Sequence, residues 1–408
     1  MDDKQVEKLI IAEEDRQQAV IPLIASENYC SADVQEALGS VFVNKYAEGR
    51  PGKRFYAGNQ IADELELLTE QRALDLFDLK PQDWAVNVQP LSGTPANLAV
   101  LTSLLKPKQR LLSMDLDAGG HLSHGHTASL IGQLFDVKHY SVDKKTGLLD
   151  YDKIAKQTAR LKPKVLIAGA SAYPREIDFK RLAAIAHDNN ALLLADISHI
   201  AGLVAAGEHI SPFPEADVVT TTTHKTLRGP RAALIFCRQD LAVTVNRGVF
   251  PGLQGGPHLN QIAATAVALH EAMQPSFKIY AAAIRQNAAA LAKSLTANGW
   301  KLVTGGTENH LLLIDLTGTE LTGATAQQRL EAVGIISNAN RIPFDQGTAF
   351  NPSGLRLGTA AVTTLGAGPK WCQRLGILIN DVLRETKDQA ELTALVKHLR
   401  FDLLTADH

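Results

Sequence analysis

The sequence predicts an α/β protein in which a large domain with a mostly parallel sheet is followed by a smaller α/β domain. Short apolar segments rich in branched residues alternate with helical segments between about residues 84 and 236. A Gly- and Pro-rich break at 250–257 ends this alternation, and two long helical segments follow it. The chain of 408 residues is long enough for one large domain and one smaller domain.

Hydrophobic periodicity places the elements in order along the chain. We expect a helical N-terminal arm at 1–22, a large domain at 23–272 and a small C-terminal domain at 273–408. Strands are expected at 84–88, 111–114, 135–140, 165–168, 191–195, 218–221, 232–236 and 310–316. Helices are expected near 2–20, 59–78, 96–105, 150–160, 178–189, 258–273, 276–298, 325–333 and from 370 onward, with a loop-rich stretch around Arg356.

Residues 44–58 combine glycines, aromatic side chains and charges and follow no clear period. An irregular stretch of this length is usually either functional or disordered. Its aromatic residues argue against disorder, so a functional loop is expected here.

Composition and charge exclude several classes of protein. Hydrophobic residues make up 45% and charged residues 21%, as in ordinary globular proteins. A formal net charge of −2 offers no electrostatic argument for binding nucleic acid. The three cysteines are far apart and lack metal-ligand spacing, so we expect no metal site and a reducing compartment. Without a recognisable signal peptide or membrane span, the chain is expected to be cytoplasmic.

Lys225 is the first candidate for chemistry. It follows four consecutive threonines and His224, just past the strand expected at 218–221, and a Gly-Pro turn comes after it. In an open α/β sheet, ligands bind at the carboxyl ends of the strands. Neighbouring cations favour the neutral amine that a Schiff-base lysine needs. A lone lysine in such a place is more often a solvated loop residue, so the rest of the pattern decides.

The other strand ends supply the groups that one cofactor requires. Asp196 ends the apolar run 191–195, and His199 follows three residues later. Upstream, Ser92-Gly93-Thr94 opens a helix, where amide groups and hydroxyls suit a phosphate. Each feature alone has an ordinary explanation, such as a helix cap for Asp196 or for Ser92. Together they favour pyridoxal phosphate, which needs a lysine, a carboxylate beside its ring nitrogen and a phosphate anchor. No strand is followed by G-x-G-x-x-G, which argues against a nicotinamide cofactor.

At these residues the sequence resembles serine hydroxymethyltransferase, and the resemblance extends from residue 23 to beyond Arg356. The matching motifs lie at 25–29, 44–49, 119–125, 196–203, 221–227, 250–257 and 353–356. The resemblance implies the aspartate-aminotransferase fold (fold type I) and a homodimer with shared active sites, and it leaves open a tetramer of two such dimers. It also implies reversible conversion of L-serine and tetrahydrofolate to glycine and methylene-tetrahydrofolate, with pyridoxal phosphate as cofactor and tetrahydrofolate as cosubstrate.

The resemblance also implies roles for individual residues. Lys225 would form the Schiff base, Asp196 would pair with the ring nitrogen, and His121 would stack on the ring. The other cofactor contacts would be Ser92, Gly93, Thr94, Ser171, His199, His224, Tyr46 and, from the partner subunit, Gly256. Substrate contacts would come from Ser26, Arg356, Tyr56, Glu48, Asn340, Leu116, Gly120 and Leu122. Arg356 would bind the substrate carboxylate, Asn340 the pterin, and the catalytic set would be Lys225, Glu48, Tyr46, His199 and Asp196.

Residues 44–58 acquire a purpose from this resemblance, since Tyr46, Glu48 and Tyr56 would reach the neighbouring active site. Glu48 would shuttle a proton and meet the folate, although by itself it could be a solvated loop carboxylate. The chain departs from the common family pattern at Arg50, Phe55, Ala57, Ala118, Arg341 and Ala360. These departures bear on the folate pocket more than on the cofactor.

Two other functions remain open at this point. A folate-independent aldolase for threonine-type β-hydroxy amino acids would use the same chemistry at Lys225, but it would not need Tyr46, Glu48 and Asn340. A catalytically silent structural homologue would have lost Lys225, Asp196 or Arg356, and all three are present.

Overall fold

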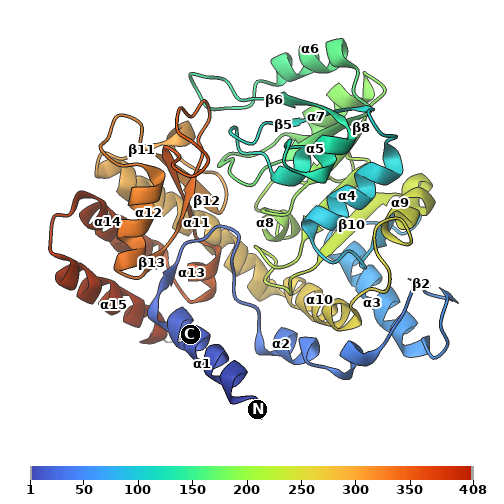
Figure 1. Ribbon diagram of the computed structural model, residues 1–408, viewed down its shortest axis with the longest axis horizontal. Coiled ribbons are helices and arrows are strands. Elements are labelled where there is room, and N and C mark those ends of the chain that lie inside the picture. Colours follow the sequence, from blue (N-terminus) through green and yellow to red (C-terminus); the bar gives the residue numbers. More distant parts are fainter. Residues whose placement is uncertain (1, 406–408) are drawn as a thin grey trace. The chain divides into compact units, whose positions relative to one another are not determined.

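The computed structural model describes residues 2–405 and contains the α/β architecture expected from the sequence (Figure 1). It divides into two compact units, one of residues 28–282 and one of residues 1–27 together with 283–408. The expected domain limits were 23–272 and 273–408. Residues 23–27 fall with the C-terminal residues because Leu23 N donates to Ile336 O, and Gly358 N donates to Leu23 O. The second border lies inside helix α11 (Pro275–Ala297).

The larger unit, residues 28–282, is organised around a seven-stranded sheet. The strand order is β4 (Trp84–Asn87), β10 (Ala233–Arg238), β9 (Val218–Thr222), β8 (Leu192–Asp196), β7 (Val165–Gly169), β5 (Arg110–Met114) and β6 (Asp136–Tyr140). The pairs from β9 to β6 are parallel, and β10 is antiparallel to both of its neighbours. Each strand coincides with a strand expected from the sequence, to within one or two residues.

Helices cover both faces of this sheet. On one face, α4 (Gly93–Leu104) and α9 (Ala242–Val249) pack with inward residues of β7 to β10 such as Ile167 and Leu194. Helix α7 (Phe179–His187) packs on β7 and β8 without joining that cluster, so it covers the other face. The remaining helices are α2 (Ala32–Leu38), α3 (Gln60–Leu76), α5 (Leu130–Leu134), α6 (Tyr151–Leu161), α8 (Ala201–Ala205) and α10 (Leu259–Ala272). Of these, α10 packs against both α2 and α3.

The expected irregular segment 44–58 is ordered by a small hairpin. Its strands β2 (Gly49–Arg50) and β3 (Lys53–Arg54) pair antiparallel, with Gly49 opposite Arg54. These strands were not expected from the sequence because each has only two residues, too few to show a period. A 3-10 turn over Val41–Asn44 precedes them.

The smaller unit contains a four-stranded antiparallel sheet in the order β11 (Lys301–Leu302), β12 (Leu311–Asp315), β15 (Gly354–Gly358) and β14 (Asn338–Asn340). Beside it, β1 (Ile21–Pro22) pairs parallel with β13 (Ile335–Ile336). Its helices are α1 (Lys4–Ala19), the end of α11, α12 (Gly323–Ala332), α13 (Ala360–Thr364), α14 (Pro369–Arg384) and α15 (Gln389–Thr405).

The expectation of a loop-rich stretch around Arg356 was wrong, because Arg356 lies on strand β15. The glycines at both ends of the strand conceal it in the sequence, while pairing with β12 and β14 makes it an inner strand. Within residues 2–405, no helix is both long and apolar enough to span a bilayer.

Candidate active site

Lys225 lies in the turn after β9, and its side chain is buried, with 9% of the residue exposed. Its Nζ donates to Thr222 Oγ1 over 3.0 Å, and its carbonyl oxygen accepts from Asn28 Nδ2 over 2.8 Å. The surrounding threonines are hydrogen-bonded too, with Thr226 Oγ1 donating to the carbonyl of His199. This lysine is therefore held in the protein at a strand end and is not a solvated loop residue.

Asp196 ends the neighbouring strand β8, and β8 pairs with β9 so that Asp196 faces Thr220. Its Oδ2 accepts from His124 Nε2 at 2.9 Å and from Asn97 Nδ2 at 2.8 Å, and its Oδ1 accepts from Ser198 N at 3.0 Å. Burial opposes ionisation of this carboxyl. The hydrogen bonds, above all that from His124, nevertheless hold the pKa of Asp196 well below its usual range.

His124 and Asn97 were not expected from the sequence. Asn97, on α4, also accepts from Thr220 Oγ1 at 2.7 Å and donates to Ser123 Oγ at 2.9 Å. The only available signal was the second histidine of the His121-Leu122-Ser123-His124 motif, which the resemblance did not assign a role. The structure thus adds two buried partners that fix the Asp196 carboxylate.

The expected phosphate site lies at the first turn of α4. Ser92 precedes this helix, yet its side chain makes no capping hydrogen bond. A Cβ on Gly93 would lie 2.7 Å from Thr222 Cγ2, so the absence of a side chain there keeps the turn against β9. The first amides of a helix have no intrahelical acceptor, and they point outward with the positive end of the dipole. Thr94 belongs to the same turn.

His224, the residue before Lys225, has a buried ring nitrogen that can donate or accept a hydrogen bond. Its Nδ1 is buried and has no hydrogen-bond partner within residues 2–405. Burial, together with the positive charges of Lys225 and Arg231, lowers the pKa of His224 to about 3, so the imidazole is neutral at physiological pH. A buried ring nitrogen without a protein partner is what a bound ligand could satisfy.

His121 precedes the short turn Leu122–His124, and its Nδ1 accepts from Ser123 N at 3.1 Å. Ser171, expected after β7, donates from Oγ to Gly120 O over 2.8 Å. These contacts join the loop that contains Leu116, Gly120, His121 and Leu122 to the end of β7. The structure therefore brings His121, Gly120 and Ser171 together, and His199 is buried on the segment after β8.

Tyr46, Glu48 and Tyr56 form a second cluster in the same unit. Tyr46 OH donates to Glu48 Oε1 over 3.0 Å, and the rings of Tyr46 and Tyr56 meet edge to face with centroids 5.0 Å apart. This hydrogen bond raises the pKa of Tyr46. A Cβ on Gly256 would lie 3.2 Å from Tyr46 Cζ, so this glycine packs directly against the tyrosine ring. Gly256 thus belongs with the Tyr46 and Glu48 cluster of its own chain.

Three expected substrate contacts lie in the smaller unit. Arg356 donates from Nε to Asn338 Oδ1 over 3.0 Å, and burial lowers the pKa of its guanidinium to about 10, which leaves it cationic at neutral pH. Ser26 follows Ala25, which packs against Gly358 at the end of the same strand. Asn340 lies on β14, opposite Gly354.

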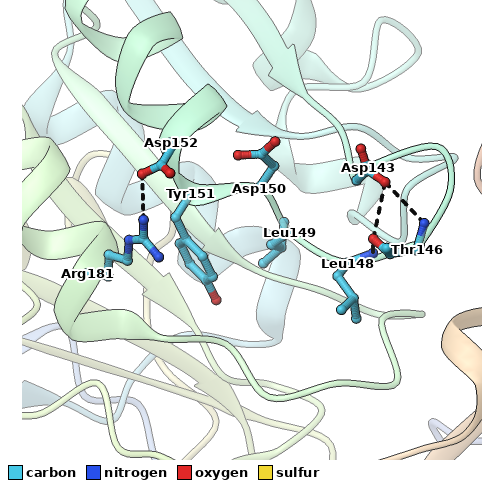
Figure 2. A pocket seen from close by; sticks show the side chains of 8 residues that line it. All are labelled: Asp143, Thr146, Leu148, Leu149, Asp150, Tyr151, Asp152 and Arg181. Carbon is cyan, nitrogen blue, oxygen red and sulfur yellow. Dashed lines mark hydrogen bonds and ion pairs between the residues drawn. The ribbon is translucent and has the colours of Figure 1, made fainter.

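The hollow in Figure 2 is separate from these residues. It measures about 320 Å³ and is lined by Asp143, Thr146, Leu148, Leu149, Asp150, Tyr151, Asp152 and Arg181. Arg181 extends toward Asp152, while Asp143 turns back on Thr146 (Figure 2). None of the expected site residues lines it. Within residues 2–405, no group of three or more His, Cys, Asp and Glu side chains is placed to hold a metal ion.

Comparison with known proteins gives one consistent result. A family model described as serine hydroxymethyltransferase matches residues 1–379. A serine hydroxymethyltransferase of Desulfotalea psychrophila is 49% identical over 398 residues, covering 98% of this chain and 92% of the relative. A serine hydroxymethyltransferase of Coprothermobacter proteolyticus is 48% identical over 399 residues, covering 97% of this chain and 95% of the relative.

Proposed function

The chain belongs to the serine hydroxymethyltransferase family, and we propose that it performs the reaction of that family. This reaction converts L-serine and tetrahydrofolate reversibly to glycine and methylene-tetrahydrofolate, a step of one-carbon metabolism. The observation that carries the proposal is the buried Lys225 at the carboxyl end of β9, beside a buried and ionised Asp196 at the end of β8.

The residues at this edge of the sheet fit pyridoxal phosphate, the cofactor of the family. Lys225 supplies the amine for the cofactor aldehyde, and the ionised Asp196 suits a protonated ring nitrogen. The first turn of α4, with Ser92, Gly93 and Thr94, suits the phosphate. The buried Nδ1 of His224, which has no hydrogen-bond partner among the described residues 2–405, supports a ligand at this place. His121, Ser171 and His199 complete the set that would contact the ring and its phenolic oxygen.

When bound, the cofactor supplies an electron sink for the electron pair that remains when the Cα–Cβ bond of serine breaks. His124, Asn97 and Ser198 keep Asp196 charged and in place. Arg356, with Ser26, binds the substrate carboxylate, for which a guanidinium offers paired donors. Glu48 holds the proton of the serine hydroxyl, and Tyr46 orients Glu48 through their hydrogen bond.

Folate would meet Glu48, Tyr56 and Asn340, and the backbone and side chains of Leu116, Gly120 and Leu122 would line the substrate path. We further propose that the enzyme is a homodimer in which Tyr46, Glu48, Tyr56 and Gly256 serve the partner's active site. Their clustering around Tyr46 supports this, because they can then act as one surface. We also propose a cytoplasmic location for this protein. All three cysteines are free thiols, as expected in a reducing compartment.

The test uses the protein loaded with pyridoxal phosphate. Borohydride reduction followed by digestion and mass spectrometry is expected to leave the cofactor on the peptide that contains Lys225, and Lys225→Ala is expected to abolish this label. Glycine formation from L-serine is then measured with and without tetrahydrofolate. Dependence on folate supports the proposal. Labelling at Lys225 with threonine-type cleavage and no folate dependence would instead show an aldolase.

A further inference from the structure

Residues 46–56, which we call the Glu48 hairpin, carry the carboxylate to which the proposed function assigns a proton. The main chain around Glu48 is fixed by the β2–β3 pairing and by a hydrogen bond from Phe55 N to Glu48 O of 3.1 Å. Lys45 Nζ donates hydrogen bonds to the carbonyls of Tyr46 and Ala57, which lie at the two ends of the segment. Since two pairs of strand residues hold little by themselves, other groups must keep this hairpin in shape.

Arg54 is the group that contacts both sides of Glu48. Its Nη1 donates to the carbonyl of Ala47 over 3.1 Å and to the carbonyl of Gly49 over 2.7 Å. These carbonyls belong to the residues immediately before and after Glu48. One guanidinium nitrogen therefore fixes the backbone on either side of the proposed proton carrier.

Arg54 is itself held by helix α3. Its Nε donates to Asp63 Oδ1 over 2.7 Å and its Nη2 to Glu66 Oε2 over 2.6 Å. The side chains of Arg54 and Glu66 are 4% and 0% exposed, so solvent screens this pair little. Asp63 also accepts from Gly52 N at the tip of the hairpin.

Arg50, in the same hairpin, provides a contrast. It pairs with Glu66 at 2.8 Å and with Glu70, but none of its hydrogen bonds goes to a carbonyl of the hairpin. Arg50→Lys removes a guanidinium from the same cluster of carboxylates, keeps the charge, and leaves the carbonyls beside Glu48 bound to Arg54. Arg50, whose side chain is 26% exposed against 4% for Arg54, is therefore a control for the loss of a guanidinium from this cluster.

We propose that Arg54 is a positioning residue that fixes Glu48 for the folate-dependent reaction, by joining the carbonyls beside Glu48 to the carboxylates of Asp63 and Glu66. This inference rests on the proposed function for its consequence in catalysis, but the geometry it claims can be tested separately. A lysine at position 54 keeps the charge, yet its single ammonium lacks the planar set of donors that reaches both carboxylates and both carbonyls.

The first experiment is a double-mutant cycle on the cofactor-loaded enzyme, with Arg54→Lys, Glu48→Gln and both together. Arg54→Lys is expected to lower kcat of the folate-dependent reaction about tenfold with little change in the KM for serine, because misplaced catalytic groups cost rate rather than binding. In the Glu48→Gln background the same change should have almost no effect. Arg50→Lys should change kcat less than about twofold. Equal losses from Arg54→Lys in both backgrounds would overturn the proposal, because Arg54 would then act independently of Glu48.

The second experiment needs no activity. Hydrogen exchange of the holoenzyme is compared for the Arg54→Lys, Arg50→Lys and unchanged proteins. Faster exchange confined to the Glu48 hairpin in Arg54→Lys alone supports positioning, and unchanged exchange there refutes it. If Arg54→Lys does not fold, Asp63→Asn is used instead, because it removes one hydrogen-bond partner of Arg54. It should also speed exchange in the Glu48 hairpin, but by a smaller factor. If the wild-type protein shows no folate-dependent activity, the proposed function is refuted. The exchange result would still decide the role of Arg54.

Discussion

His124 donates a hydrogen bond from Nε2 to Asp196 Oδ2 over 2.9 Å, and both side chains are buried. The two residues come from different parts of the chain, 72 positions apart. Their contact accounts for a carboxylate that stays ionised without solvent, which is the condition for keeping a cofactor ring nitrogen protonated.

Replacing His124 by leucine should therefore destabilise the protein. The change leaves Asp196 buried with one partner fewer, and we expect a loss of about 2–3 kcal/mol in the free energy of unfolding. Urea unfolding of the holoenzyme at a fixed cofactor concentration measures it. His187→Leu is the control, since His187 and Asp217 are also 2.9 Å apart but the histidine side chain is 45% exposed, and that pair should contribute no more than about 1 kcal/mol. Equal losses for both variants would contradict this account.

Gly93→Ala should weaken cofactor binding more than it weakens folding. The new methyl group would lie 2.7 Å from Thr222 Cγ2, so either the first turn of α4 or the Thr222 side chain, which is hydrogen-bonded to Lys225 and Ser198, must shift. We expect the Kd for pyridoxal phosphate to rise about tenfold or more, as measured by titration of the apoenzyme. At Gly39, a Cβ would meet no atom closer than 3.7 Å, so Gly39→Ala should leave the Kd unchanged. A Kd for Gly93→Ala within about twofold of the unchanged protein would refute the phosphate site at this turn.

Glu70 makes stability depend on pH near neutrality. Burial raises the pKa of Glu70 to about 7 despite the attraction of Arg50, and the negative charge of Glu66 adds to the rise. Between the ordinary value of 4.5 and about 7, the folded protein holds this proton more tightly than the unfolded chain does. Stability should therefore fall as pH rises through that window.

Glu70→Gln removes this titration because glutamine imitates the protonated acid. As pH increases from 4.5 to 8, the free energy of unfolding of the variant should rise relative to that of the wild-type protein by up to about 3 kcal/mol. Urea unfolding at each pH measures this difference. A difference that stays constant over the range would show that Arg50 keeps Glu70 ionised throughout.

The large sheet could be predicted because most of its strands are apolar segments bounded by turns, which a sequence displays directly. Strand β6 is the exception, since its Lys138 and His139 are exposed. Helices α2 (Ala32–Leu38) and α9 (Ala242–Val249) were not expected, since seven- or eight-residue helices show too few turns for a clear stripe. Strand β15 was not predicted for another reason. Its conformation depends on the neighbours β12 and β14, which lie far away in the sequence.

The candidate site divides in the same way. Lys225, Asp196 and His199 could be proposed because each follows a recognisable strand, so their places at the edge of the sheet follow from topology. Asn97 and His124 could not, because Asn97 lies inside a helix and reaches Asp196 only after α4 has packed on the sheet. The role of Arg54 was hidden likewise, since the charged run 50–54 does not reveal that one arginine faces α3 and the backbone of its own hairpin.

Arg356→Lys tests the carboxylate site on β15. Arg356 is half-buried and oriented by Asn338, so its guanidinium is held in place before substrate arrives. A lysine keeps the charge but loses the paired donors that match a carboxylate, and we expect the KM for serine to rise about 100-fold with a smaller change in kcat. Arg329→Lys, on α12, is the control, since Arg329 pairs with Glu385 and with the carbonyl of Leu383 and should leave the KM unchanged. With a pKa of about 10, Arg356 stays cationic between pH 6 and 8.5, so its loss should raise the KM equally at both ends of that range. A variant that keeps the KM for serine and loses only kcat would place the substrate carboxylate elsewhere.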